Sequence, residues 1–331
     1  MINVPRVIPL KVCVIIPCYR VRAHISYVIR HIPASVSKIY VVDDCCPESS
    51  GKYVQENVED LRVEVLFNDV NLGVGGALKT GYKKGLAEGF DIFIKIDGDG
   101  QMDPELVPFF IDPILIKRAD YTKGSRFHSL NSLEGMPTIR KLGNSILSLV
   151  NKFSSGYWDV MDPTNGFTAI HKTALGQLPL DKISNRFFFE SDMLFRLGTI
   201  RAVVKDIPMD AVYADESSNL KVGEVIFEFV PLYIKAFFKR TMYCYFLRDF
   251  NVGTLELVVG SILFLFGSVF GSWRWLLAAA ENEVASTGTV MIASIPIILG
   301  FQLLLSAFHF DIANIPHTPI QNDGRSNGID E

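Results

Sequence analysis

The sequence has little cysteine, and the cysteine that it has follows no pattern. The five cysteines among 331 residues are odd in number and show neither CxxC spacing nor a partner histidine at zinc-site spacing. Disulfide-stapled domains and zinc modules both depend on such spacing. We therefore expect neither a disulfide framework nor a zinc site, and a reducing, cytosolic setting for most of the chain.

The chain also lacks an excess of basic residues. Its formal net charge is -4, whereas a nucleic-acid-binding protein needs a concentrated basic face to neutralise phosphates. The first twenty residues lack the basic region and the small-residue cleavage site of a signal peptide. We expect no nucleic-acid partner and no cleaved leader.

What is present in the first third of the chain is an alternation of strand-like and helix-like segments. Short β-branched runs are separated by helical patterns, most clearly by the Gly- and Ala-spaced segment 72–89. This rhythm predicts an α/β fold with a doubly wound, mostly parallel sheet. The expected strands are residues 12–16, 38–42, 62–67, 92–96, 121–123, 166–170 and 202–207.

Carboxylates follow two of these predicted strands. Asp43 and Asp44 close the second, and Asp97 and Asp99 close the fourth, separated by Gly98. Ligands of such sheets bind at the carboxyl ends of the strands, and two carboxylates on a tight glycine turn suit a hard cation such as Mg²⁺ or Mn²⁺ with a pyrophosphate. An isolated Asp-Gly-Asp is more often a turn that merely ends a strand.

The composition changes after residue 221. Residues 222–250 mix apolar and basic side chains and predict amphipathic helices in a membrane interface. Residues 251–311 contain two apolar runs, each near the ~20 residues that cross a bilayer, and basic residues cluster before the first run. We expect two membrane spans, with residues 1–221 on the cytoplasmic side and residues 312–331 as a disordered cytoplasmic tail.

Seven motifs occur in one order along the chain, and together they resemble family 2 inverting glycosyltransferases of the GT-A fold. Within that family the chain is most similar to the dolichyl- and polyprenyl-phosphate sugar synthases, and its two predicted spans resemble the bacterial polyprenyl-phosphate glucosyltransferase branch. The motifs are VIIPCYR (14–20), VVDDCCPESSG (41–51), NLGVGGALKTGYKKG (71–85), IDGDGQMDPE (96–105), KGSRF (123–127), DPTNGF (162–167) and FFFESDML (188–195).

The resemblance implies a donor site for a nucleotide sugar and a catalytic role for Asp99. Arg126 resembles the family arginine that meets a phosphate, which suits the bidentate geometry of guanidinium. Three residues, Arg20, Val21 and Arg22, depart from the Asn and Glu that many relatives carry after the tyrosine. The implied donor residues are Pro17, Tyr19, Asp43, Asp44, Asp97, Gly98, Gln101 and Arg126, and the implied metal ligands are Asp97, Asp99 and Gln101.

The acceptor side is implied by the acidic motif and by basic residues near the membrane. Asp192 resembles the family's catalytic carboxylate, which acts as a base when the nucleophile is a hydroxyl. A lipid phosphate monoester is largely dianionic at neutral pH, with a second pKa near ~6, so a base is not required for it. Arg140 and Lys221 are the expected contacts of the lipid phosphate.

Three functions remain open at this point. The first is transfer of a hexose from a UDP- or GDP-sugar to polyprenyl or dolichyl phosphate, giving a lipid-linked sugar for glycan or cell-envelope assembly. The second is transfer to a hydroxyl of a lipid-linked glycan, for which Asp192 is indispensable. The third is a non-catalytic membrane scaffold, which survives loss of Asp99. A homo-oligomer is compatible with each.

Overall fold

The computed structural model describes residues 10–128, 138–210 and 222–322, with residues 138–142 and 222–228 described by their backbone alone. The described chain falls into two compact units. The first comprises the residues up to Phe237 together with those from Pro316 onward, and the second comprises Phe238–Ile315. The first unit contains the sheet, and the second contains two long apolar helices.

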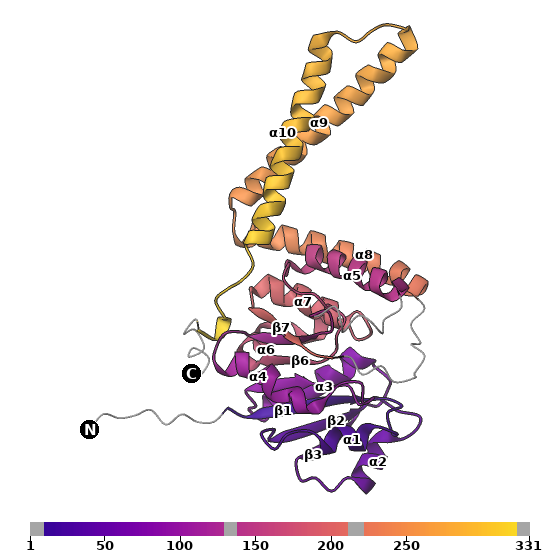
Figure 1. The fold of residues 1–331 in the computed structure, drawn as a ribbon, viewed down its shortest axis with the longest axis vertical. Coiled ribbons are helices and arrows are strands. Elements are labelled where there is room, and N and C mark those ends of the chain that lie inside the picture. The colour runs from indigo at the N-terminus through magenta and orange to yellow at the C-terminus, as the bar shows by residue number, and fades with distance from the viewer. Residues whose placement is uncertain (1–9, 129–137, 211–221, 323–331) are drawn as a thin grey trace, which may run out of the picture. The chain divides into compact units, whose positions relative to one another are not determined.

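A seven-stranded sheet forms the centre of the first unit (Figure 1). Its strand order is β3-β2-β1-β4-β6-β5-β7. Only β6 runs antiparallel, against β4 and β5, while the other pairs are parallel. The strands are β1 (Val12–Cys18), β2 (Lys38–Asp43), β3 (Val63–Phe67), β4 (Ile92–Lys95), β5 (Tyr121–Ser125), β6 (Thr168–His171) and β7 (Val204–Pro208).

Helices cover the sheet because its central strands are apolar on both faces. Helix α3 approaches β1 closely, since a Cβ atom on Gly81 would lie 2.4 Å from Ile15 Cγ2. The small residues of this helix therefore have a packing role. The helices of this unit are α1 (Ile25–Arg30), α2 (Ser50–Asn57), α3 (Val74–Ala87), α4 (Val107–Leu115), α5 (Thr138–Ser155), α6 (Lys172–Gln177), α7 (Phe189–Ile200) and most of α8 (Val222–Thr241).

The predicted fold class is confirmed. Each expected strand occurs within two residues of its predicted limits, and the mostly parallel order places the ends of β1, β2 and β4 at one edge. Strand β6 runs antiparallel to both of its neighbours, although it follows helix α5 along the chain. Periodicity alone does not carry that information.

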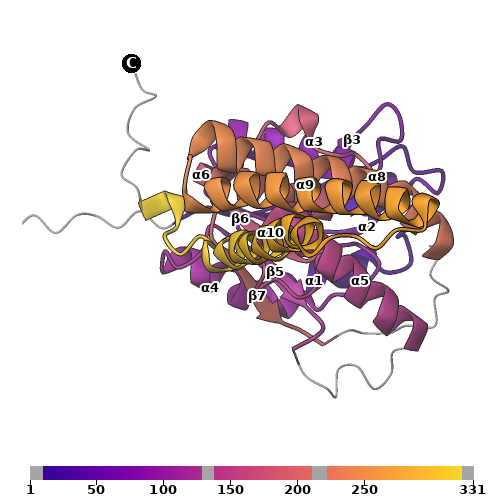
Figure 2. The same ribbon diagram turned by 90° about the horizontal axis from the view of Figure 1, so that it is seen from above.

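The second unit contains two helices, α9 (Val252–Glu281) and α10 (Thr287–Ala313), that are long and apolar enough to cross a membrane. Figures 1 and 2 both show them side by side. Small residues permit the close approach, since a Cβ atom on Gly300 would lie 2.5 Å from the backbone nitrogen of Phe264. A π-helical turn, Met242–Arg248, precedes α9. Few side chains of either helix are buried, and the others are exposed or half-buried, as expected for helices that face lipid.

The structure corrects the expectation of a disordered tail from residue 312. Helix α10 continues to Ala313, and residues Ile320–Asn322 form a 3-10 turn. The fully buried carboxylate of Asp120 accepts hydrogen bonds from the backbone nitrogens of Ile320 (2.9 Å) and Gln321 (3.2 Å). The Gln321 amide donates to two backbone carbonyls of the same unit. The segment after α10 is therefore fastened to the start of β5, and residues 323–331 lie outside the described chain.

Candidate active site

A cavity of about 1000 Å³ opens at the carboxyl edge of the sheet. One wall is formed by the residues at and after the ends of β1 and β4, and another by α5 and α8. The first wall is polar and the second is mostly apolar. The cavity therefore joins charged groups at the sheet edge to an apolar surface on the two helices.

Asp97 and Asp99 lie together at the end of β4 and both line this cavity. Gly98 separates them, and a Cβ atom there would lie 3.1 to 3.2 Å from Ile16, Val21 and Ile25, so this turn fits a glycine. The backbone nitrogen of Gln101 donates to Asp99 Oδ1 at 3.0 Å. The Gln101 side chain is exposed and does not line the cavity, so its metal-ligand role stays a prediction without support from the geometry.

The donor set at this edge suits a hard divalent cation. Among the described residues no group of three or more His, Cys, Asp or Glu side chains gathers, so the protein would supply the two carboxylates of Asp97 and Asp99. Magnesium and manganese sites of nucleotide-dependent enzymes commonly use one or two carboxylates and take their remaining oxygens from phosphates and water. The residues present fit such a cation when it arrives with a diphosphate.

A buried lysine lies next to these carboxylates. Lys95 on β4 is 1% exposed, and its Nζ lies 2.8 Å from Asp97 Oδ1 and 3.2 Å from Glu190 Oε1. Burial by itself lowers the pKa of Lys95, but the two carboxylates outweigh burial and hold the pKa above its ordinary value. Lys95 is therefore a permanent cation in the polar wall of the cavity.

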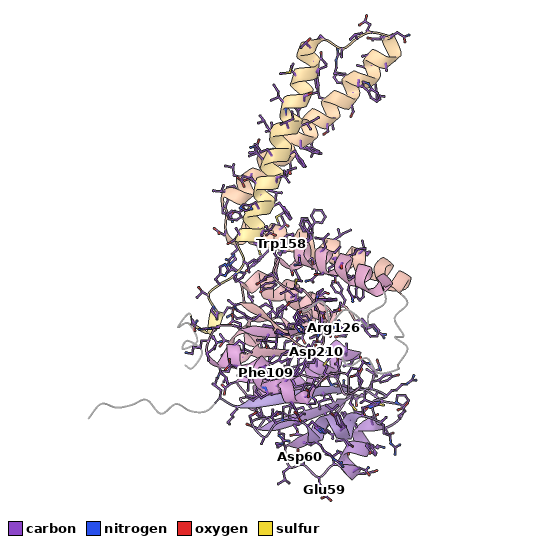
Figure 3. All side chains as sticks on the ribbon, in the orientation of Figure 1. Glu59, Asp60, Phe109, Arg126, Trp158 and Asp210 are labelled. Atoms are coloured by element: carbon purple, nitrogen blue, oxygen red, sulfur yellow. The ribbon has the colours of Figure 1, made fainter. Side chains whose placement is uncertain are left out.

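Arg126 follows β5 and forms a two-point ion pair with Asp162. Its Nε lies 2.7 Å from Asp162 Oδ2 and its Nη2 lies 3.0 Å from Oδ1. Burial favours a raised pKa for Asp162, but Arg126 and then Lys123 lower it below its ordinary value. Arg126, which is labelled in Figure 3, follows Ser125 at the end of β5 and lines the cavity.

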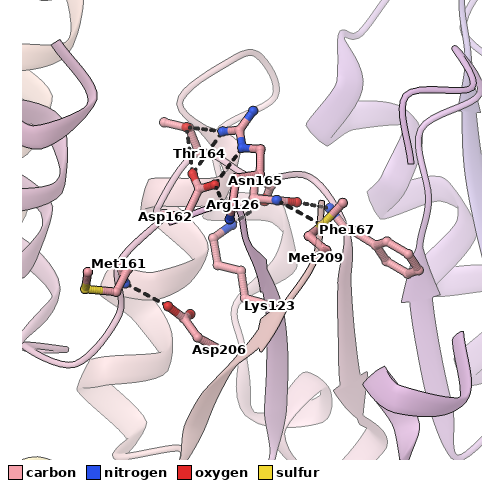
Figure 4. Close-up of polar contacts among 9 residues, drawn as sticks. All are labelled: Lys123, Arg126, Met161, Asp162, Thr164, Asn165, Phe167, Asp206 and Met209. Atoms are coloured by element: carbon pink, nitrogen blue, oxygen red, sulfur yellow. Dashed lines mark hydrogen bonds and ion pairs between the residues drawn. The ribbon is translucent and has the colours of Figure 1, made fainter. Parts of the chain in front are cut away.

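A second fully buried lysine, Lys123, lies near the ion pair of Arg126 and Asp162 (Figure 4). Lys123 donates to the backbone carbonyl of Asn165, and burial lowers its pKa to about 8. Asp206, nearby on β7, accepts a hydrogen bond from the Met161 backbone at 2.8 Å, and burial raises its pKa to about 6. These groups fix the loop that contains Asp162.

The predicted nucleotide residues divide into two groups. Pro17, Tyr19 and Asp44 line the cavity. Asp43 does not, because its carboxylate accepts from the backbone nitrogens of Cys46 and Gly51, each at 2.7 Å, and so holds the turn after β2. The structure thus gives Asp43 a turn-stabilising role, and its contact with a nucleotide stays a prediction.

Asp44 is also hydrogen-bonded within the protein. Its Oδ1 accepts from Asn68 Nδ2 at 2.8 Å and from the Leu72 nitrogen at 3.0 Å. Its Oδ2 accepts from the Gly73 nitrogen at 2.7 Å, where Gly73 has a φ of +85°. Asp44 therefore fixes the loop before α3 at the cavity wall, and a carboxylate has lone pairs left for a further donor.

The acidic residues of α7 are placed differently from the sequence-based expectation. Asp192 does not line the cavity, because its Oδ2 accepts from the Ser184 nitrogen at 2.7 Å and its Oδ1 lies 3.1 Å from Arg196 Nε. Glu190, two residues earlier, lines the cavity and pairs with Lys95. The role of Asp192 at the reacting centre stays a prediction, and these contacts argue against it.

The apolar wall comes from α5 and α8. Phe188, Phe229 and Tyr233 form a small buried cluster against which Leu147 and Val150 pack. Figure 1 shows α5 and α8 at the same end of this unit. The residues of these helices that line the cavity are Gly143, Asn144, Ile146, Leu147, Val150, Phe229, Val230 and Tyr233.

The structure does not describe the side chains of the two residues that were predicted to contact the lipid phosphate. Arg140 belongs to α5, but its side chain lies outside the described part, and Lys221 lies outside the described residues altogether. Thr164, in the DPTNGF motif, lines the cavity. Its Oγ1 lies 3.4 Å from Arg126 Nη2.

The residues that sequence reasoning missed are Lys95, Lys123 and Asp162. The sequence contained a signal for the first two, because each is a single lysine within an otherwise uncharged strand. A charged residue in a buried strand is rarely fully buried unless it is paired. Asp162 gave no such signal, since its partner Arg126 is 36 residues away.

Comparison with known proteins agrees with this geometry. The model of the glycosyl transferase family 2 domain matches residues 13–178. The chain is 28% identical over 225 residues to the undecaprenyl-phosphate mannosyltransferase of Micrococcus luteus, covering 67% of this chain and 91% of that protein. It is 28% identical over 231 residues to the UDP-N-acetylglucosamine–dolichyl-phosphate N-acetylglucosaminyltransferase of Methanococcus voltae, covering 64% and 92%.

Among solved structures, the chain resembles glucosyl-3-phosphoglycerate synthase from Mycobacterium tuberculosis in complex with Mn²⁺, UDP-glucose and phosphoglyceric acid. The TM-score is 0.52 at 17% identity, covering 70% of this chain and 79% of that one. At this identity the likeness shows the fold, which is the GT-A fold. The match over half of its residues shows that the chain belongs to glycosyl transferase family 2.

Proposed function

We propose that the protein transfers a hexose from a nucleoside-diphosphate donor to the phosphate of a polyprenyl or dolichyl lipid. The observation that carries the proposal is that Asp97, Asp99 and Arg126 line the same cavity as apolar side chains of α5 and α8. A water-soluble acceptor would not need the apolar wall. The two relatives described above, whose names give undecaprenyl and dolichyl phosphates as acceptors, support the same acceptor class.

The reaction requires one bond to form and one to break. An oxygen of the lipid phosphate forms a bond to the anomeric carbon, the bond from that carbon to the diphosphate breaks, and the diphosphate leaves with the electron pair. Direct displacement inverts the anomeric configuration. Because the lipid phosphate is already largely dianionic at neutral pH, the chain need not provide a base, and its contribution is alignment and charge stabilisation.

The residues of the polar wall divide this work. Asp97 and Asp99 would hold a magnesium or manganese ion, which neutralises charge on the departing diphosphate. Arg126, held by Asp162, presents its guanidinium to a phosphate in the cavity. Asp44 and Gly73 set the wall beside the nucleotide.

The membrane arrangement belongs to the same proposal. Two helices that cross a bilayer one after the other return the chain to the side from which it started, so the residues before α9 and after α10 would lie on the same side of the membrane. Lys235, Lys239 and Arg248 precede α9, and basic residues favour the cytoplasmic side. The catalytic unit thus faces the cytoplasm, where nucleotide sugars are available, and α9 and α10 span the bilayer.

The proposal is tested with the purified full-length chain, a panel of radiolabelled UDP- and GDP-sugars, and polyprenyl phosphate in detergent. We expect label in an acid-labile lipid monophosphate sugar from one donor class, lost with EDTA and with Asp99→Ala. Asp103→Ala is the matched control, because Asp103 caps the following 3-10 turn outside the cavity. No lipid label from any donor, with nucleotide binding intact, would refute the proposal.

A further inference from the structure

Lys95 lies between two carboxylates that come from different parts of the fold. Asp97 follows β4, the strand that contains Lys95, whereas Glu190 lies in the first turn of α7. The side chain of Lys95 is 1% exposed, that of Glu190 is 11% exposed, and that of Asp97 is 29% exposed. The ion pair with Glu190 is thus the more deeply buried of the two.

The space around this ammonium is confined. A Cβ atom on Gly166 would lie 2.4 Å from both Lys95 Nζ and Asp97 Oδ2. The loop containing Gly166 therefore closes against the pair, and Lys95 and Glu190 line the same cavity as Asp97 and Asp99. The lysine has two carboxylates within reach and little room to move elsewhere.

One ammonium shared by two carboxylates compensates neither fully. A divalent cation at the Asp97–Asp99 edge would compete with Lys95 for the negative charge of Asp97, because both are held by the same carboxylate. The closer Lys95 lies to Glu190, the more of the Asp97 charge is available to the divalent cation. Since Lys95 is buried, its Coulomb energies with the two carboxylates are larger than they would be in bulk water.

We propose that Lys95 is a built-in counterion of Asp97 whose hold on that carboxylate is set by Glu190, so that Glu190 tunes how tightly the Asp97–Asp99 edge binds a divalent cation and its diphosphate. Lys95 and Glu190 are positioning residues in this scheme, because they act through Asp97. The inference rests on the proposed function only in taking a metal-bound diphosphate as the occupant of this edge.

The scheme predicts opposite effects for its two members. Lys95→Met removes the competing cation, so the affinity for Mn²⁺ rises. Glu190→Gln removes the charge of one of the two carboxylates beside Lys95. Lys95 then interacts more strongly with Asp97, so the affinity of the Asp97–Asp99 edge for Mn²⁺ falls. We expect changes of about tenfold in each direction, within the range usual for coupled sites. In the double variant, Glu190→Gln has little further effect, because Glu190 acts through Lys95.

The test measures Mn²⁺ binding by electron paramagnetic resonance in the full-length chain, alone and with UDP and GDP. Four proteins are compared: wild type, the two single variants and the double variant. Lys83→Met is the matched control, because Lys83 pairs with Asp181 at the surface, with side chains 58% and 85% exposed. Circular dichroism checks that each variant is folded. If Lys95→Met does not fold, the test is the expected fall in Mn²⁺ affinity of the Glu190→Gln variant.

The result expected is a rise for Lys95→Met, a fall for Glu190→Gln, and no change for Lys83→Met. A fall in both single variants with unchanged folding would overturn this inference and leave the proposed function standing, since it would give Lys95 a merely structural role. Equal effects of Glu190→Gln with and without Lys95 would also overturn it. Wild-type protein that binds no Mn²⁺ even with nucleotide would overturn both the inference and the metal part of the proposed function.

Discussion

Arg126 and Asp162 are held in a two-point ion pair, with Nε 2.7 Å from Oδ2 and Nη2 3.0 Å from Oδ1, although 36 residues separate them in the sequence. The side chain of Asp162 is fully buried, while that of Arg126 remains 27% exposed and lines the cavity. The buried carboxylate therefore orients a guanidinium that is partly exposed and lines the cavity.

Asp162→Asn is expected to lower the specific activity strongly and to destabilise the fold. The amide keeps the shape of the carboxylate but removes the charge, and breaking a buried pair costs about 3 to 5 kcal/mol because the partner is left uncompensated. Transfer rate and thermal midpoint of the full-length chain are measured together. Asp181→Asn, in the exposed pair with Lys83, is the control and should change neither; a fully active Asp162→Asn enzyme would contradict the positioning role.

The apolar wall of the cavity predicts an effect of acceptor chain length. Leu147 lines the cavity from α5, whereas Leu149 on the same helix is 50% exposed and does not line it. Leu147→Ser should raise the KM for a long polyprenyl phosphate and leave the KM for a short alkyl phosphate unchanged, because it alters a contact with the lipid chain. Leu149→Ser should change neither value. A similar effect of both substitutions would mean that α5 does not receive the lipid through this wall.

The contact of the C-terminal segment with β5 predicts a local opening. Gln321 donates two side-chain hydrogen bonds and its backbone nitrogen donates to Asp120. Gln321→Ala should speed hydrogen exchange of residues 316–322, since each lost hydrogen bond contributes about 1 kcal/mol. Thr318→Ala, at an exposed position, should leave exchange unchanged. Unaltered exchange in Gln321→Ala would show that these bonds do not fasten the segment.

Asp206 predicts a pH dependence with a definite sign. Burial raises its pKa from 3.8 to about 6, so between these values the folded protein binds a proton that the unfolded chain has lost. Stability contributed by this group is therefore fully present below pH 3.8 and is lost as the pH rises to about 6. One pKa unit corresponds to about 1.4 kcal/mol, so the whole loss is at most about 3 kcal/mol.

Asp206→Asn removes that titration. The side-chain carbonyl oxygen of the asparagine can still accept a hydrogen bond from the Met161 backbone nitrogen, as the Asp206 carboxylate does. The urea midpoint of the variant relative to wild type should therefore increase between pH 4 and pH 7. Asp210→Asn, on an exposed residue after β7, is the control. A constant difference over this range would refute the raised pKa.

Much of the fold was predictable because local pattern determines it. The runs that became β1, β2 and β4 are apolar and β-branched, and the carboxylates at their ends mark the edge where the cavity lies. The length and apolarity of α9 and α10 were equally visible. The mostly parallel direction of the strands followed from the alternation with helices, except for the antiparallel β6, whereas the order of the strands comes from the structure.

The rest of the site could not be predicted because it depends on contacts between distant segments. Glu190 and Asp192 are two residues apart in one motif, yet only Glu190 faces the cavity, because Asp192 is bound by Ser184 and Arg196. The order in the C-terminal segment depends on Asp120, 200 residues earlier. Composition there is polar and predicts disorder, and only the tertiary partner reverses that prediction.

The central claim is that a lipid phosphate, and not a hydroxyl, receives the sugar in this cavity. The most direct measurement compares transfer of label to polyprenyl phosphate and to polyprenol of the same chain length, by wild type and by Asp192→Asn. We expect label on the phosphate alone, retained in Asp192→Asn, because the phosphate dianion needs no base. Label on the alcohol that disappears in Asp192→Asn would contradict the account and identify a hydroxyl acceptor with Asp192 as its base.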